Sequence, residues 1–198
     1  MNKKNWMMLG AVALAFGVTG ALVGTRQKAA APPAATPAPQ PGSTQAAAPP
    51  SSAPLAPGAG PVESLYAQAL NDVAGKPQSL SQWKGKALVV NFWAPWCAPC
   101  VKEMPELAAF ATDSAAKGVS VIGIGIDSPS NIAQFADKYR ISYPLYVAGM
   151  SGTELSRQFG NQGGGLPFTV LLSSGGRVVK TYLGKLKMDE LRRDISAL

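Results

Sequence analysis

The chain has 198 residues, which leaves room for one ordinary domain together with accessory segments. It contains two cysteines and no histidine, which excludes imidazole metal ligands, haem with an axial histidine, serine–histidine catalysis and an all-cysteine zinc site within one chain. The formal net charge is +7, but four of the basic residues lie beside an N-terminal apolar run and the other charges are interspersed, so we expect no nucleic-acid partner.

The chain begins with an apolar run that is long enough to cross a membrane. Residues 6–23 form its apolar centre, and two basic residues lie on each side of it. A spanning helix needs about 20 apolar residues, whereas a cleavable signal usually has a shorter apolar region before a small-residue site. We therefore expect residues 1–28 to be an uncleaved signal-anchor, with cleavage near residues 29–31 as the alternative. The balanced basic flanks only slightly favour an inside N terminus, which would place the rest of the chain outside.

A segment of low complexity follows the apolar run. Residues 29–61 contain 12 Ala and 10 Pro and no charged residue. A segment with so few large apolar side chains cannot offset its ordering entropy, and its prolines favour an extended chain. We expect a disordered linker, with a proline-rich partner motif as the alternative. Residues 62–198 have ordinary globular composition and are numerous enough to bury a core.

The first part of this domain is predicted to contain a hairpin, a buried strand and a long helix. Residues 65–70 and 78–80 flank a turn-rich stretch, which indicates a hairpin or two short strands. Residues 87–94, with the sequence ALVVNFWA, form a short apolar run that is typical of a buried strand. Residues 101–117 have apolar side chains at helical spacing, and Gly118 follows them as a helix stop.

The middle of the domain repeats this order of strand and helix. Residues 119–126 form a second apolar run that predicts a buried strand. Ser128 and Pro129 are typical of a helix start, and a helix is expected after them. Residues 143–147 are expected to form a short strand, and residues 153–159 one or two helical turns.

The last part of the domain is predicted to be a hairpin and a helix. Residues 168–172 and 177–183 flank the sequence Ser-Ser-Gly-Gly, a strong hairpin signal, and residues 188–198 have the pattern of an amphipathic helix. Strands that are separated by helices imply parallel neighbours joined by crossovers, and the hairpin adds an antiparallel edge. The order of elements therefore predicts an α/β domain with a mixed central sheet and helices on both faces.

Cys97 and Cys100 fall where the predicted strand at 87–94 turns into the long helix. Two cysteines three apart in a first helical turn have Cα atoms about 5–6 Å apart, within reach of a disulfide. Backbone N–H groups without intrahelical partners would stabilise the Cys97 thiolate and lower its pKa, whereas Cys100 would be more buried. We therefore predict that Cys97 attacks a substrate disulfide and that Cys100 resolves the mixed disulfide. The alternative, a structural disulfide, is disfavoured because so short a loop removes little unfolded-state entropy.

Two neighbouring residues are candidates for shaping this site. Pro99 removes one N–H from the array that favours the thiolate, and it stiffens the loop between the cysteines. Trp96, next to the thiol, is the candidate for an apolar surface that receives an extended substrate. Trp93 is expected to pack in the core instead.

Residues 89–105, VVNFWAPWCAPCVKEMP, resemble the active-site segment of the thioredoxin superfamily, in particular its TlpA/ResA-like branch of bacterial, membrane-anchored thiol–disulfide oxidoreductases. The resemblance extends over about residues 62–198 and includes GLPFTVLLSSGGRVVKTYLG near the C terminus. It implies a thioredoxin-like fold, a redox-active Cys97–Cys100 disulfide in place of a cofactor or metal, and a catalytic domain in the periplasm or otherwise outside the cytoplasm.

The resemblance also assigns roles to residues outside the cysteine pair. Pro167, with Leu166 before it, matches a cis-proline that packs beside the disulfide and presents backbone to extended substrates; a trans proline is the alternative. Glu103 matches a glutamate that handles protons near the thiols, and a solvated helix residue is the alternative. Pro105 matches a proline within the active-site helix. Asn91 stands where thioredoxins have a buried aspartate, so any proton relay must use Glu103 or water.

The leading functional interpretation is a reductase of protein disulfides. The resemblance implies electrons from a membrane thiol carrier and a role such as cytochrome c maturation. A disulfide oxidase or isomerase would use the same residues, and the direction of electron flow is not readable from the two residues between the cysteines. A thiol peroxidase is a further alternative, although no peroxide-binding Thr/Arg pattern lies near Cys97. The intact cysteine pair argues against a non-catalytic binding module, and the absence of histidine argues against copper delivery.

Overall fold

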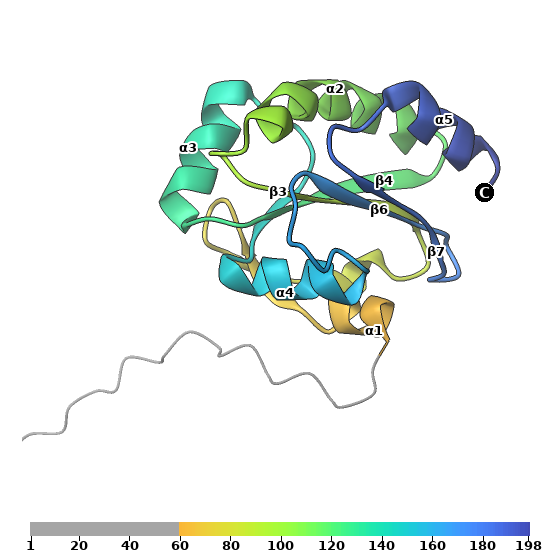
Figure 1. Cartoon of the computed structure of the whole chain (residues 1–198), viewed down its shortest axis with the longest axis horizontal. Helices are drawn as coiled ribbons and strands as arrows, with labels where there is room; N and C mark the ends of the chain where they lie inside the picture. The colour runs from red at the N-terminus through yellow and green to blue at the C-terminus, as the bar shows by residue number, and fades with distance from the viewer. Residues whose placement is uncertain (1–59) are drawn as a thin grey trace, which may run out of the picture. The chain divides into compact units, whose positions relative to one another are not determined.

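The computed structural model describes residues 60–198 (Figure 1). The signal-anchor predicted at residues 1–28 and nearly all of the linker predicted at residues 29–61 lie outside this range. Among residues 60–198, no helix combines the length and apolarity that are needed to cross a bilayer.

A seven-stranded mixed sheet forms the centre of the described region, in the order β2-β1-β5-β4-β3-β6-β7. The strands are β1 (Ala69–Asp72), β2 (Pro77–Ser79), β3 (Ala87–Trp93), β4 (Val119–Gly125), β5 (Leu145–Val147), β6 (Phe168–Leu172) and β7 (Val178–Leu183). The β3–β4 and β4–β5 pairs are parallel, whereas β1–β2, β1–β5, β3–β6 and β6–β7 are antiparallel. This arrangement confirms the predicted mixed sheet, with its parallel centre and an antiparallel hairpin at one edge.

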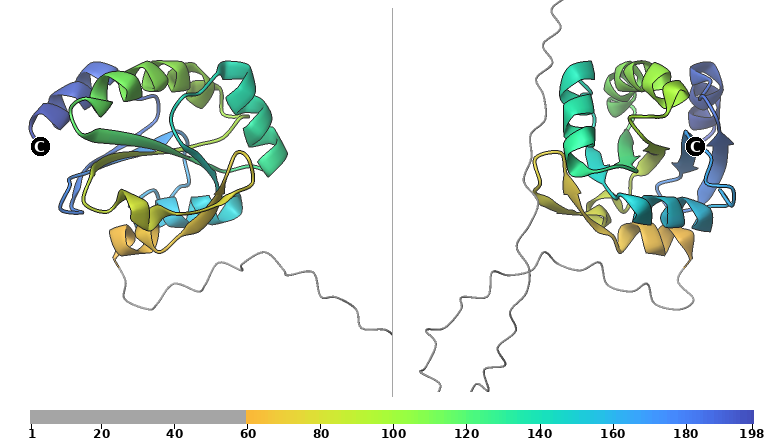
Figure 2. Two further views of the ribbon diagram at one scale, coloured as in Figure 1. Left: turned by 180° about the vertical axis from the view of Figure 1, so that it is seen from behind. Right: turned by 60° about the vertical axis from the view of Figure 1, so that its left-hand side comes forward.

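Helices cover both faces of this sheet, as the sequence predicts. They are α1 (Pro61–Tyr66), α2 (Ala98–Ala115), α3 (Pro129–Tyr139), α4 (Met150–Gln158) and α5 (Met188–Ser196), with a 3-10 helix η1 at Leu80–Trp83. Helices α2, α3 and α5 lie on one face, and α1 and α4 lie on the other (Figures 1 and 2). The crossovers between the parallel strands run through α2 and α3.

Side chains alternate across the sheet and divide the core in two. Along β3, Val89 and Trp93 pack under α2 and α3, whereas Leu88, Val90 and Phe92 pack toward α1 and α4. Both faces of β3 are therefore buried, which explains why its sequence is almost continuously apolar. Asn91 lies on the α2 face by the same alternation and is fully buried.

The start of the domain differs from the prediction. The sequence predicts a strand at residues 65–70, whereas α1 continues to Tyr66 and β1 begins only at Ala69. Pro61 occupies the first turn of α1, where its missing N–H breaks no helical hydrogen bond, and Leu65 and Tyr66 are buried. Six residues are too few to display a helical period, so the apolar residues at the end of α1 look like the start of a strand in the sequence.

Candidate active site

The loop after β3 delivers Cys97 to the N terminus of α2. Cys97 is the N-cap residue, and the backbone N–H of Cys100 donates a hydrogen bond to its Sγ at 3.3 Å. Helix α2 begins at Ala98, which agrees with the prediction that Cys97 lies just before the first helical residue, and Pro99 is well accommodated in a first helical turn. The N-cap and the first turn of α2 therefore carry the two cysteines, with Pro105 further along the same helix.

Cys97 and Cys100 form a disulfide, with their Cα atoms 5.3 Å apart. The two residues differ in accessibility: 5% of the Cys97 surface is exposed, whereas Cys100 has no exposed surface. Helix α2 and the sheet cover Cys100, while Cys97 lies at the end of the helix. Cys97 is therefore the sulfur that an incoming partner can approach more easily.

The tryptophans beside the disulfide occupy different environments. Trp93 is fully buried, with its ring centroid 4.7 Å from that of Phe135, whereas 68% of the Trp96 surface is exposed. The peptide bond between Leu166 and Pro167 is cis. Strand β6 begins at the next residue, Phe168, which pairs with Phe92 near the C-terminal end of β3, so this cis peptide lies at the sheet end from which the Cys97 loop departs. Trp96 and the residues before β6 are thus brought to the same end of the sheet.

A groove of about 800 Å³ extends from Trp96 over neighbouring segments. Leu166, Pro129 and Met150 contribute to its walls, and 80% of the Met150 surface is exposed. Among the described residues that line it, Asp127 alone carries a charge. The groove is therefore suited to apolar groups. Met150 is missed by the sequence analysis because no sequence pattern reveals that α4 starts next to the cysteine loop.

Glu103 lies on the inner face of α2, one turn after Cys100, and has no exposed surface. Its Oε2 accepts a hydrogen bond from the backbone N–H of Leu186 at 2.8 Å, and its Oε1 accepts one from Asn91 Nδ2 at 2.9 Å. This position excludes the alternative of a solvated helix residue. Both carboxylate oxygens are held by donors from other parts of the fold.

The environment of Glu103 disfavours its charged form. Burial raises the pKa of the Glu103 carboxyl above its ordinary value, because a poorly polarisable interior solvates a charge less well than water. The hydrogen bonds from Leu186 and Asn91 and the nearby Lys185 oppose this rise, but burial outweighs them. Glu106 contributes a smaller repulsion in the same direction as burial. A carboxyl group with a raised pKa exchanges protons closer to neutral pH than an ordinary glutamate does.

Asn91 links Glu103 to strand β6. Its Nδ2 also donates to Thr169 Oγ1 at 3.0 Å, and both residues are fully buried although they are 78 positions apart. Asn91 stands out in the sequence as a departure from thioredoxins, whereas Thr169 and the N–H of Leu186 are not predicted to belong to the site. A lone hydroxyl in the apolar run FTVLL is the signal that could have singled out Thr169.

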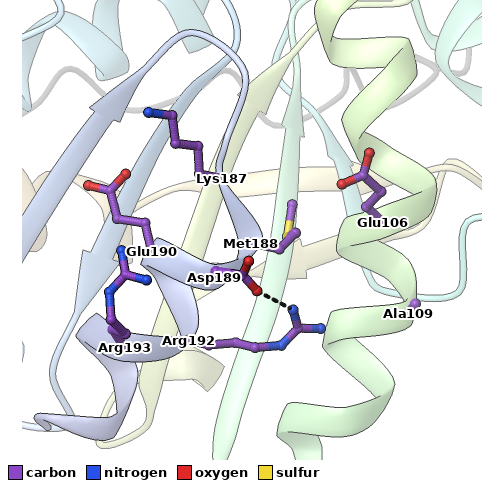
Figure 3. A pocket seen from close by; sticks show the side chains of 8 residues that line it. All are labelled: Glu106, Ala109, Lys187, Met188, Asp189, Glu190, Arg192 and Arg193. Atoms are coloured by element: carbon purple, nitrogen blue, oxygen red, sulfur yellow. Dashed lines mark hydrogen bonds and ion pairs between the residues drawn. The ribbon is translucent and has the colours of Figure 1, made fainter.

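A second pocket, of about 630 Å³, lies between α2 and α5, and neither cysteine lines it (Figure 3). Its lining carries both signs of charge: Glu106 on α2, Lys187 and Asp189 at the start of α5, and Arg192 in the middle of α5. Arg192 and Asp189 form an ion pair at 3.5 Å. Charges that are mixed and partly paired select no class of ligand, so the cysteine end of the sheet is the candidate active site.

Comparisons with known proteins find similar sequences and structures over most of the described residues. The family described as Redoxin matches residues 44–195. The thiol-disulfide oxidoreductase ResA of Bacillus thuringiensis (strain Al Hakam) is 32% identical over 123 residues, which cover 62% of this chain and 69% of that protein. ResA of Geobacillus thermodenitrificans is 25% identical over 130 residues, 65% of this chain and 72% of that protein. The crystal structure of a thiol:disulfide interchange protein of the thioredoxin family from Chlorobium tepidum TLS is 30% identical, with a TM-score of 0.57 over 66% of this chain and 91% of that one.

Proposed function

Because this chain belongs to the Redoxin family and is a thioredoxin-like thiol–disulfide oxidoreductase similar to ResA, we propose that it reduces protein disulfides outside the cytoplasm. The observation that carries this proposal is the Cys97–Cys100 disulfide in the first turn of α2, with the more exposed sulfur at the N-cap. Unpaired backbone N–H groups at this helix end stabilise a thiolate on Cys97 in the reduced protein.

The proposed reaction is a pair of thiol–disulfide exchanges. The Cys97 thiolate attacks one sulfur of a substrate disulfide, which forms a mixed disulfide and releases the first substrate thiolate. The Cys100 thiolate then attacks Cys97 Sγ, which closes the Cys97–Cys100 disulfide and releases the second substrate thiolate. Two electrons pass from the enzyme dithiol to the substrate. A thiol carrier in the membrane is the proposed donor that reduces the enzyme again.

Glu103 is the proposed proton-handling residue of the second exchange. Cys100 must lose its proton before it attacks, and it is shielded from solvent by its burial. The carboxylate of Glu103, one helical turn away on the inner face of α2, accepts that proton and returns it when the enzyme is reduced again. Asn91 lacks a titratable group, so the aspartate route of thioredoxins is closed in this chain.

The proposed substrates are extended protein segments that carry a disulfide. The groove that Trp96, Leu166 and Met150 line takes apolar side chains near the substrate cysteine. In this proposal Pro99 stiffens the loop between the two cysteines, and the cis-proline Pro167 presents backbone to the extended substrate. The largely uncharged lining of this groove supports apolar contact as the basis of recognition.

We further propose that the domain is held at the bacterial inner membrane. The support is the apolar run of residues 1–28 with its basic flanks, followed by the Ala/Pro-rich stretch at 29–61 as a linker. Both segments lie outside the described residues. Cytochrome c maturation is the proposed setting, because thioredoxin-like proteins of the resembling branch serve it.

Replacement of each cysteine by alanine tests the proposed function. With the full chain and dithiothreitol as electron donor, insulin reduction should fall to the uncatalysed rate in Cys97→Ala. Cys100→Ala should instead accumulate a mixed disulfide through Cys97, visible by mass spectrometry after an alkylating quench. Lys102→Ala, an exposed change on the same helix, is the control that retains activity. Full activity in Cys97→Ala would show that the nucleophile is misassigned.

A separate measurement tests the direction of electron flow. The equilibrium of the Cys97–Cys100 pair with glutathione gives its reduction potential, and a reductase requires a potential close to that of thioredoxin rather than that of a strong disulfide oxidant. A strongly oxidising value would favour the oxidase or isomerase alternative, which uses the same two sulfurs.

A further inference from the structure

The side-chain amide of Asn91 is held at one end only. Its Nδ2 donates to Glu103 and to Thr169, whereas its Oδ1 is buried and has no hydrogen-bond partner among the described residues. A second buried asparagine, Asn161, is held at both ends: its Nδ2 donates to the carbonyl of Gly165, and its Oδ1 accepts from the N–H of Gly165. Only Asn161 is therefore locked in one orientation by backbone groups of fixed polarity.

The N–H of Leu186 determines where a proton on Glu103 can lie. It donates to Oε2 at 2.8 Å, so this oxygen has to remain an acceptor in both protonation states. A proton that Glu103 takes up therefore lies on Oε1, the oxygen that faces Asn91 Nδ2 at 2.9 Å. Two donors would then face each other, and two donors cannot form a hydrogen bond. The observed orientation of Asn91 suits only the ionised form of Glu103.

We propose that Asn91 is a positioning residue whose amide turns by half a rotation whenever Glu103 gains or loses its proton. In the turned orientation Oδ1 takes the place of Nδ2 and accepts hydrogen bonds from Glu103 Oε1–H and from the hydroxyl of Thr169. Thr169 serves both orientations because a hydroxyl donates as well as accepts. This inference rests on the proposed role of Glu103 in handling the Cys100 proton.

The turn gives the proton-handling group a hydrogen-bond partner in each state. A donor of fixed polarity would favour only the carboxylate and would oppose the proton uptake that the second exchange requires. The charged and titratable groups that face Glu103 are Glu106 on α2, Lys185 before α5 and the buried Tyr143 before β5, besides the cysteine pair itself. None of them hydrogen bonds to the carboxyl group, so Asn91 alone responds to the position of its proton.

Carbon-13 NMR of the oxidised, full-length protein tests this inference, since disulfide cysteines do not titrate. The Asn91 Cγ signal should move during a pH titration with the same midpoint as the Glu103 carboxyl signal, in the direction that an amide carbonyl shows when it starts to accept hydrogen bonds. The Asn161 Cγ signal is the matched control and should not follow this midpoint.

The variant Glu103→Gln provides a second, independent test of the inference. A glutamine can present its oxygen to Leu186 and its Nε2 to Asn91, and so imitates protonated Glu103. The Asn91 Cγ signal of this variant should stay at the low-pH position of the native protein at every pH. An Asn91 signal that stays fixed while Glu103 titrates, or one that matches the high-pH position in the variant, would overturn the inference.

These results are separable from the proposed function. A fixed Asn91 amide, together with a shifted pH dependence of Cys97 alkylation in reduced Glu103→Gln, overturns the amide turn and leaves the proton-handling role in place. A turning amide, together with an unchanged alkylation profile, supports the inference about Asn91 and removes Glu103 from the exchange mechanism.

Discussion

Glu103 differs from every other acidic residue of the described chain in where its carboxylate lies. It is the one acidic side chain among residues 60–198 that is buried. Asp194 shows the usual case: hydrogen bonds from Tyr182 and Lys180 hold the pKa of its carboxyl below the ordinary value. The pKa of Glu103 is shifted in the opposite direction, mainly by burial. Two carboxyl groups of one domain thus have different chemistry because one is solvated and the other is not.

Trp96 offers a test of recognition at the level of one side chain. Trp96→Ala removes the largest exposed apolar group beside Cys97, so the KM for a protein disulfide should rise by about tenfold, which corresponds to about 1.4 kcal/mol. The turnover number should change less than KM, because the indole contacts substrate before the sulfurs react. Steady-state reduction of insulin over a range of concentrations measures both constants.

An exposed apolar residue elsewhere serves as the control for this change. Leu198 lies at the C terminus, is 48% exposed and does not line the groove. Leu198→Ala should leave both constants as they are in the native protein. Equal KM values for native protein and Trp96→Ala would show that the groove does not receive substrate.

The elements that the sequence predicts well are those that are buried on both faces or that have strong end signals. Strands β3 and β4 are continuous apolar runs because helices cover both sides of them, and Pro129 begins α3 as predicted. Helix α1 is not predicted, because its six residues contain less than two turns and so show no helical spacing. Helix α4 begins at Met150, three residues before the predicted start. No side chain caps its N terminus, so the sequence carries no signal for the residue at which it begins.

Gly123 in β4 allows the sheet and its covering segments to approach closely. A Cβ atom at this position would lie 2.5 Å from Leu145 Cδ2, 3.0 Å from Trp93 Nε1 and 3.3 Å from Tyr143 Cε2. All three neighbours are buried and have little room to move. Gly123→Ala should therefore lower the free energy of unfolding by about 1–3 kcal/mol, as overpacked cores do. Urea denaturation followed by tryptophan fluorescence measures this loss.

Gly163→Ala is the matched control for the change in β4. A Cβ atom there would meet nothing within 4 Å, and this glycine is not among those with a positive φ. The free energy of unfolding of Gly163→Ala should stay within about 0.5 kcal/mol of the native value. If Gly123→Ala were as stable as this control, the packing of Leu145, Trp93 and Tyr143 around Gly123 would have to be looser than the structure indicates.

The proposed proton-handling group is assembled from parts of the chain that are distant in sequence. Asn91 comes from β3, Glu103 from α2, Thr169 from β6 and the N–H of Leu186 from the segment before α5. The cysteine pair could be predicted because its residues are local and their spacing carries the chemistry. The burial of Glu103 could not, because it depends on how α2 and the segment before α5 pack over the sheet. The resemblance supplied Glu103 as a candidate, but the hydrogen bonds around it required the fold.

The raised pKa of Glu103 has a consequence for the stability of the whole protein. In the unfolded chain this residue titrates near its ordinary value of 4.5, and in the folded protein it titrates at a higher pH. Between these two values the folded state binds more protons than the unfolded state, so this residue makes stability fall as pH rises through that window. Below pH 4.5 both states are protonated and the penalty is absent.

Glu103→Gln removes this penalty and keeps the shape of the side chain. Its free energy of unfolding, minus that of the native protein, should increase as pH rises from about 4.5 and level off above the folded pKa. The increase is about 1.4 kcal/mol for each unit by which folding raises that pKa. Urea denaturation of both oxidised proteins at a series of pH values measures this difference. Asp72 and Asp194 have lowered pKa values, which act on stability in the opposite direction. Their contributions cancel in the difference because both proteins contain them. Two parallel stability profiles would mean that the Glu103 carboxyl has the same pKa in the folded and unfolded states.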